Sequence, residues 1–125
     1  MEKRNKIKYS ITLYFKEQPD INLLIENGYT VRSGYAVAKN HFYVSLTNID
    51  GYSDLERKNI VGLINNEFSI CFEKHIFVAY TSYFDTGNLF IPKEISDISY
   101  EINAPIWVSI IFGEDVLPLS SPTIN

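Results

Sequence analysis

The sequence predicts an α+β fold, in which a mainly antiparallel sheet carries two main helices on one face. Three patterns lead to this class. Residues 7–15 alternate between apolar and polar side chains with the period of a half-buried strand. Residues 55–68 and 91–102 carry apolar residues at helical spacing. Residues 106–112 are almost continuously apolar, as in a strand that is covered on both faces.

The length and composition indicate one domain. A chain of 125 residues with 46% hydrophobic residues can bury one core but not two. We expect a single α+β domain over residues 1–113. Residues 114–125 contain Pro118, Pro122 and several small polar residues, and we expect an extended or disordered tail there.

In the first half of the chain, the alternating strand 7–15 is followed by a short helical turn. Pro19 and Asp20 open this turn, and Asn27-Gly28 caps its end. Residues 29–38 and 42–49 then read as two neighbouring strands, because a three-residue loop between them fits a hairpin. Gly34 predicts a bend or bulge in the first of the two.

The first main helix begins after a turn at residues 50–52. Ser53 and Glu56 have the spacing of a capping box, in which each side chain accepts a hydrogen bond from the other residue's amide. We expect the apolar face of this helix to consist of Leu55, Ile60, Leu63, Ile64 and Phe68. Residues 69–72 and 75–83 are strand-like. Glu73-Lys74 between them is either a tight turn or a polar point on one long strand.

The second main helix follows a loop at residues 85–88. Its stripe contains Ile91, Ile95, Ile98 and Ile102, with Pro92 at its start and Asn103 as a cap. The final strand, residues 106–112, is apolar on both faces except at Ser109. We therefore expect an inner strand. Trp107→Asp or Ile110→Asp should then unfold the domain.

The order of the elements is strand, short helix, strand, strand, helix, strand, helix, strand. This order is the ferredoxin-like, split β-α-β pattern with an added helix–strand unit.

Charge and targeting signals limit the possible partners. The formal net charge is -4 and no basic cluster exceeds two residues, so we expect no direct nucleic-acid partner. Neither a signal-peptide pattern nor a long apolar run is present in the sequence, so we expect a cytoplasmic protein with no membrane contact. The single cysteine, Cys71, lies between Ile70 and Phe72, and we expect a buried, inert thiol.

One short motif resembles a catalytic element. Asp85-Thr86-Gly87 resembles the aspartic-protease triplet, and residues 110–113 resemble the apolar segment that supports it. However, Asn88 stands where a small Ser or Ala is expected. Only 38 residues follow Gly87, too few for the remaining protease strands. We interpret the triplet as a loop that uses Asp and Gly for turn geometry.

Metal and nucleophile patterns are weak. Asp50, Asp54 and Glu56 lack the calcium-loop spacing, and the two acids at 54 and 56 suit the first turn of a helix. His41 and His75 lack a zinc-site spacing. A nucleophilic set would combine Cys71, Glu73 and His75 on one strand face, but only if the strand is unbroken. We expect no cofactor, no metal site and no catalytic residues, and so no enzyme.

What remains is an aromatic and acidic surface. The chain has nine Tyr and eight Phe, and tyrosine is frequent in protein interfaces. Tyrosine also suits the edge of a sheet with its hydroxyl in water, so both interpretations stay open. We predict partner-binding residues at Tyr14, Tyr43, Tyr52, Asp50, Asp54, Glu56, Tyr83 and Asp85.

Two resemblances go beyond single residues. Residues 68–112, with the loop Thr86-Gly87-Asn88 and the helix start Ile91-Pro92-Lys93-Glu94, resemble a bacterial domain family of unknown function with a ferredoxin-like fold. The small, acidic, Tyr- and Asn-rich chain without a catalytic motif also resembles the immunity proteins of bacterial toxin systems.

The resemblance to immunity proteins implies a function. We expect a monomeric or homodimeric binding protein that neutralises a basic toxin domain by occluding its active site. The alternative is a small enzyme or ligand-binding domain with a pocket between the sheet and the added helix. Converging polar groups such as Glu73, His75 and Asp85 would favour that alternative.

Overall fold

The computed structural model describes residues 6–82 and 90–112. These residues form one five-stranded sheet in the order β2-β3-β1-β4-β5 and a layer of helices. The elements are β1 (Lys6–Phe15), α1 (Asn22–Glu26), β2 (Val31–Ala36), β3 (His41–Thr47), η1 (Ile49–Gly51), α2 (Asp54–Asn66), β4 (Glu73–Ser82), α3 (Lys93–Ile102) and β5 (Ile106–Phe112).

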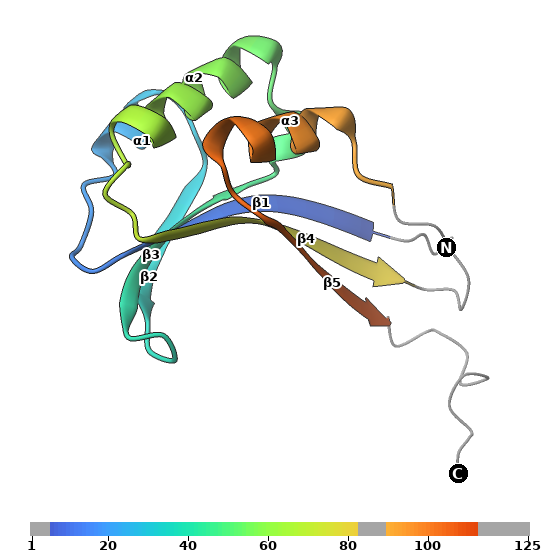
Figure 1. Cartoon of the computed structure of the whole chain (residues 1–125), viewed down its shortest axis with the longest axis horizontal. Coiled ribbons are helices and arrows are strands. Elements are labelled where there is room, and N and C mark those ends of the chain that lie inside the picture. Colours follow the sequence, from blue (N-terminus) through green and yellow to red (C-terminus); the bar gives the residue numbers. More distant parts are fainter. Residues whose placement is uncertain (1–5, 83–89, 113–125) are drawn as a thin grey trace.

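The connectivity confirms the predicted α+β class. From β1 to β4, the four strands lie in the order β2-β3-β1-β4, and every neighbouring pair is antiparallel. This is the split β-α-β arrangement. Helix α3 and strand β5 form the added unit, and β5 runs parallel to β4. The described helices all lie on one side of the sheet, and none of them covers its other face, here called the open face (Figure 1).

Strand β1 occupies the centre of the sheet and confirms the alternation. Tyr9, Ile11, Leu13 and Phe15 are buried under the helices, whereas the residues between them are partly exposed on the open face. Ile11 lies opposite Leu46 of β3 and Ile76 of β4, so three strands place apolar side chains in one row of the core.

Helix α2 begins as predicted. The Glu56 amide donates to Ser53 Oγ at 3.1 Å, and the Ser53 amide donates to Glu56 Oε1 at 2.8 Å. Ile60 and Ile64 are buried, but Leu55 is 76% exposed, so its assignment to the apolar face is wrong. With about 100° per residue, Leu55 points roughly opposite to Ile64, and the helix cannot bury both.

Helix α3 also matches the prediction. Pro92 precedes its first turn, and Asn103 ends it in the left-handed conformation with φ 54°. Ile95, Ile98 and Ile102 are buried against the sheet. The spacing of three and four residues was therefore sufficient to orient this helix.

The β2–β3 hairpin is present, but the predicted bulge at Gly34 is not. The register runs without interruption from Val31 opposite Leu46 to Ala36 opposite His41. A Cβ atom at Gly34 would lie 3.1 Å from the ring of Tyr43, which faces it across the strands. Glycine at this position therefore makes room for an aromatic ring on the neighbouring strand.

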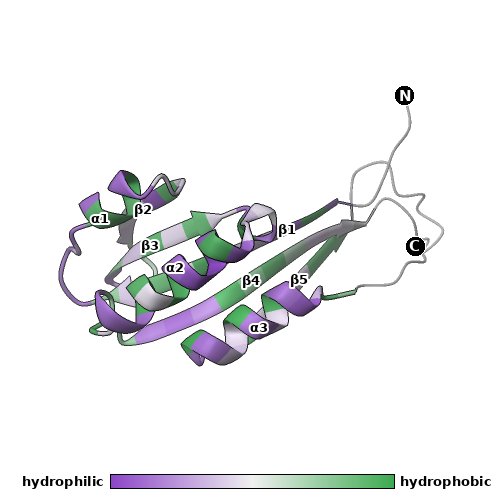
Figure 2. Ribbon diagram, turned by 90° about the horizontal axis from the view of Figure 1, so that it is seen from above, coloured by the Kyte–Doolittle hydropathy of each residue, from purple (hydrophilic) through white to green (hydrophobic). Residues whose placement is uncertain are grey.

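Residues 69–72 are not a strand, which corrects another expectation. They form the turn that leaves α2, in which the Cys71 amide donates to the Phe68 carbonyl at 3.1 Å. Glu73 and Lys74 are the polar first residues of β4, so the tight-turn alternative is wrong, and the strand begins at these two residues instead of passing through them. Figure 2 shows the hydrophilic start of β4 and the hydrophobic stretch that follows it.

Strand β5 is an edge strand, so the prediction of an inner strand is wrong. Strand β1 already occupies one side of β4, and the strand that α3 leads into can pair only with the other side. Ile110 is 55% and Trp107 43% exposed. An aspartate at either position would therefore contact solvent as well as protein, so we no longer expect either substitution to unfold the domain.

Several predictions fall on residues that the structure does not describe. Tyr83, the triplet at residues 85–87 and the tail at residues 114–125 all lie outside the described residues. Among the described helices, none has both the length and the apolar character needed to cross a membrane.

Candidate functional site

The open face of the sheet carries a row of rings that crosses four strands, here called the aromatic band. The strand register places its members on one face: Tyr14 lies opposite Tyr43, and Phe77 lies opposite Trp107. Alternation places His75 on the same face as Phe77, two residues along β4. The aromatic band consists of Tyr43, Tyr14, His75, Phe77 and Trp107.

His75 is the buried centre of this band. Its ring stacks on Trp107 with a centroid separation of 4.0 Å and an interplanar angle of 11°, and the Tyr14 ring lies 5.9 Å away. The side chain is only 5% exposed, and Nδ1 has no hydrogen-bond partner among the described residues. Burial lowers the pKa of His75, because removing the ring from water disfavours its charged form.

Lys39, from the β2–β3 turn, reaches over the middle of the band, where Tyr14 and Trp107 flank His75. Its Nζ lies 4.5 Å from the centre of the Tyr14 ring and 5.8 Å from that of Trp107, within the range of cation–π attraction. The same Nζ lies 3.3 Å from Glu73 Oε2. The pair is partly exposed, so it orients Lys39 more than it stabilises the fold.

The predicted acidic residues that the structure describes, Asp50, Asp54 and Glu56, lie in the helical layer and not on the open face. Asp50 belongs to η1, and Asp54 and Glu56 lie in the first turn of α2. Asp54 pairs with Arg57 on the same helix, and the Glu56 carboxylate accepts from the Ser53 amide. These two carboxylates thus have local structural roles, as the first-turn interpretation predicted.

Tyr52 is less accessible than a contact residue should be. Its ring meets Tyr29 edge to face at 5.3 Å, and its hydroxyl is buried without a hydrogen-bond partner in the described part of the chain. Burial raises the pKa of Tyr52, and the neighbouring Tyr29 and Glu56 raise it by smaller amounts. The structure therefore brings together Tyr14 and Tyr43, and it separates both from Tyr52 and the acidic residues.

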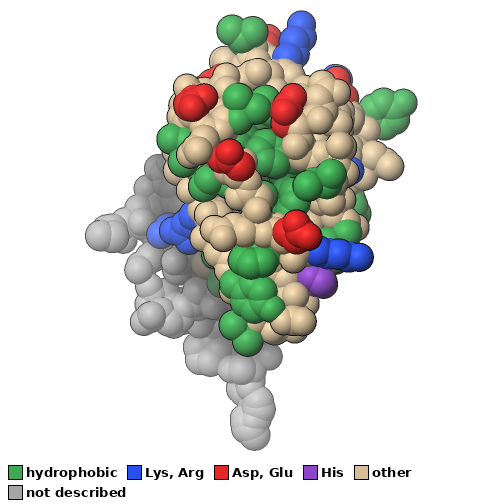
Figure 3. Space-filling model, turned by 90° about the vertical axis from the view of Figure 1, so that its left-hand side faces the viewer, with side chains coloured by type: hydrophobic (Ala, Val, Ile, Leu, Met, Phe, Trp, Pro, Cys, Tyr) green, Lys and Arg blue, Asp and Glu red, His purple; other side chains and the backbone are tan. Residues whose placement is uncertain are grey.

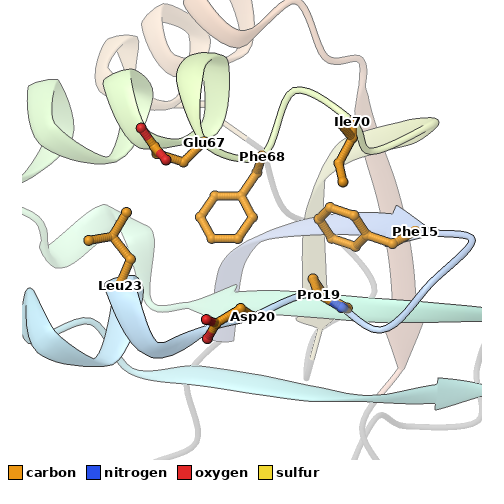
Figure 4. Close-up of a pocket in the computed structure, with 7 residues that line it drawn as sticks. All are labelled: Phe15, Pro19, Asp20, Leu23, Glu67, Phe68 and Ile70. Atoms are coloured by element: carbon orange, nitrogen blue, oxygen red, sulfur yellow. The ribbon is translucent and has the colours of Figure 1, made fainter.

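A cavity that the sequence did not indicate lies between α1 and the end of α2 (Figure 4). Its volume is about 260 Å³, and Phe15 and Phe68 form its inner wall, with rings packed edge to face at 6.2 Å. Asp20 and Glu67 stand on its rim from opposite elements. Pro19, Leu23 and Ile70 complete the lining.

The carboxylates on this rim have few partners. Asp20 Oδ1 accepts one hydrogen bond from the Asn22 amide at 2.9 Å, and the Glu67 side chain forms no ion pair with any described residue. Ile70, beside them, is 81% exposed. Figure 3 shows this end of the molecule, where carboxylates stand among exposed hydrophobic side chains.

The catalytic alternative finds little support in the geometry. Cys71 is half-buried, which corrects the expected full burial, and desolvation raises the pKa of its thiol. It precedes β4 and lines a second cavity, of about 300 Å³, with Glu73 and Trp107, whereas His75 is not among the lining residues. Within residues 6–82 and 90–112, no three His, Cys, Asp or Glu side chains form a group that could hold a metal ion.

Comparisons of the chain with models of known protein families, with curated proteins and with solved structures found no match.

Proposed function

We propose that this chain is a cytoplasmic protein-binding module of the immunity type, which neutralises a basic toxin domain by covering its active site. The observation that carries the proposal is the cavity between α1 and the end of α2, which is lined by the carboxylates of Asp20 and Glu67 together with the rings of Phe15 and Phe68. The partner in this proposal is a protein and not a nucleic acid.

This cavity suits a long basic side chain. The alkyl part of an arginine or lysine can pack on the phenylalanine rings while its charged end reaches the rim. A guanidinium can donate two parallel hydrogen bonds to one carboxylate, which adds geometric specificity to the attraction. Arginine is also frequent among the residues that dominate interface energies. The cavity therefore offers a place for one anchoring residue of the toxin.

The surroundings of the cavity fit a protein surface. The exposed Ile70 and the partly exposed Pro19 and Leu23 offer apolar contact area around the charged rim. Exposed acids elsewhere in the helical layer, among them Asp50 and Glu94, add to a negative field on that side. Such a field speeds the approach of a basic partner more than it increases the final affinity.

The test uses the product of the adjacent reading frame. We expect that product to inhibit growth when expressed alone, and this chain to restore growth and bind it. Asp20→Asn with Glu67→Gln should weaken binding at least about tenfold, because two charge-assisted hydrogen bonds are lost. Glu94→Gln with Glu101→Gln removes the same charge away from the cavity and should leave binding within about twofold.

The wild-type experiment tests the immunity function, and the double variant tests whether the cavity is the anchoring site. An adjacent product that neither inhibits growth nor binds this chain rejects the immunity proposal. Unchanged binding by the Asp20→Asn, Glu67→Gln variant, with the toxin still neutralised, rejects the cavity as the anchor and keeps the immunity function.

The ligand-binding alternative rests on the second cavity, which joins the start of β4 to the end of α3. Its polar groups do not converge, since Glu73 is directed to Lys39. A small molecule that raises the melting temperature of the wild type, but not that of Glu73→Gln, would favour this alternative.

A further inference from the structure

We propose that β5 binds β5 of a second copy of this chain. The two strands would run antiparallel about a two-fold axis at Ser109, so that one sheet continues through both protomers. This inference is independent of the proposed function, because β5 shares no residue with the cavity between α1 and α2.

The first argument is the side-chain composition of this edge. Residues 106–112 contain no charged residue, no proline and no glycine, and the strand pairs with β4 without a bulge. Edge strands usually carry such features, which prevent a further strand from adding. The opposite edge, β2, has Arg32 and Gly34. The β5 edge thus lacks the protection that the β2 edge has.

The second argument is the direction of the backbone groups. The Ile76 amide donates to the Pro105 carbonyl at 2.8 Å, which fixes the phase of the β4–β5 ladder. Because backbone groups alternate in direction along a strand, those of Trp107, Ser109 and Ile111 face β4. Those of Val108 and Ile110 face away from β4, toward the position that another strand would occupy.

The third argument is that the strand is complementary to itself. With the axis at Ser109, Trp107 lies opposite Ile111 of the second copy, and Val108 lies opposite Ile110. Each pair shares one face of the sheet, and all four side chains are 42–55% exposed in the single chain. A two-fold axis would oppose like charges on a charged strand, but this one has none.

The cross-link that tests the register places cysteine on the axis. Ser109 would form a non-hydrogen-bonded antiparallel pair, with Cα atoms about 4.5 Å apart. That separation lies within the range of a disulfide. In a Cys71→Ser background, we expect Ser109→Cys to give a disulfide-linked dimer on mild oxidation.

The matched control moves the cysteine along the same strand. In the proposed register, two copies of Ile111→Cys place their thiols about 13 Å apart, too far for a disulfide. This variant should remain monomeric on a denaturing gel without reductant. Equal cross-linking of both variants, or of neither, overturns the proposed register.

The non-covalent test uses the full chain and its only tryptophan. Sedimentation should show a monomer–dimer equilibrium, and the Trp107 emission should shift to shorter wavelength as dimers form with rising concentration. Ile110→Lys should give a monomer, while Tyr35→Lys on the β2 edge, 46% exposed in the wild type, should still dimerise.

Two results reject the self-association. One is a wild-type chain that remains monomeric at every concentration it tolerates. The other is an equal loss of dimer in Tyr35→Lys and Ile110→Lys. If Ile110→Lys does not fold, the cysteine pair at positions 109 and 111 still decides the question.

Discussion

Strands β1 and β5 show that apolar pattern and position in a sheet are separate properties. Strand β1 alternates like a half-buried strand, yet it lies at the centre of the sheet with a neighbour on each side. Strand β5 is apolar on both faces, yet it lies at the edge. The alternation of β1 shows which of its faces packs on the core, and it does not report whether the two edges of a strand are paired.

The two strands also differ in what their apolar residues contact. Those of β1 lie under the helices, where Ile11 and Leu13 are fully buried. On β5, Trp107 covers the buried ring of His75 but remains 43% exposed itself. A strand with half-exposed apolar side chains on both faces, and one unpaired edge, is one that a further strand would complete.

The largest expected effect is the difference between β1 and β5 in how much an alanine substitution lowers the free energy of unfolding. Leu13→Ala should lower the free energy of unfolding by about 2–5 kcal/mol, because it leaves a cavity in the core. Ile110→Ala should cost less than about 1.5 kcal/mol in dilute protein, since Ile110 is 55% exposed. Urea unfolding measures both. Equal losses in dilute protein would show that β5 is covered as fully as β1.

A smaller effect is expected where β5 covers the open face. Trp107→Ala removes the ring that stacks on His75 and should cost on the order of 1–2 kcal/mol. The loss of cover should also raise the pKa of His75 toward its ordinary value, because the ring regains water. NMR titration of the imidazole measures this shift. A pKa that does not rise would show that Trp107 is not what keeps His75 from water.

The next effect is a dependence of the fold's stability on pH. It arises from His75, which lies between Tyr14 of β1 and Trp107 of β5. The folded-state pKa lies below the ordinary value of 6.5, so the unfolded chain binds the proton more readily. Stability should therefore be full above about pH 6.5 and fall as the pH drops from there toward the folded-state pKa.

His75→Phe tests this pH dependence because it keeps a ring against Trp107 but cannot bind a proton. Its stability should change less than that of the wild type between pH 7 and the onset of carboxylate titration, at about pH 5. Thermal melts at a series of pH values compare the two proteins. Parallel curves would contradict a buried neutral His75.

The smallest expected effect lies on the open face of β1. Thr12, next to Leu13, is partly exposed and lies opposite Ser45 and His75. Thr12→Val keeps the β-branched shape, so stability should stay within about 0.5 kcal/mol of the wild type. A much larger loss would show that this face of β1 is not free.

Local patterns in the sequence were enough to predict most of the elements. The Ser53–Glu56 pair predicted the start of α2, and the isoleucine stripe together with Asn103 predicted α3 and its end. Both signals lie within a few helical turns, so they can be read from neighbouring residues alone. The order of elements was then enough to predict the split β-α-β class.

The candidate sites were less predictable. Tyr14 and Tyr43 were predicted separately, but only the β1–β3 register shows that they face each other. Asp20 and Glu67 were not predicted. They lie on separate elements and meet only because α1 and the end of α2 pack over Phe15 and Phe68. A pattern confined to a few neighbouring residues carries no information about such a meeting.

The sequence by itself determined most of the elements, their order and most of the faces that turn to the core, because the side-chain periods of helices and strands are local. The tertiary structure decided which strand lies at the edge. Strand β1 holds one side of β4, and β5 pairs with the other side and ends the sheet. That choice depends on which edges remain free after the other strands have paired. It left β5, an almost continuously apolar strand, with one edge that no other described strand pairs with.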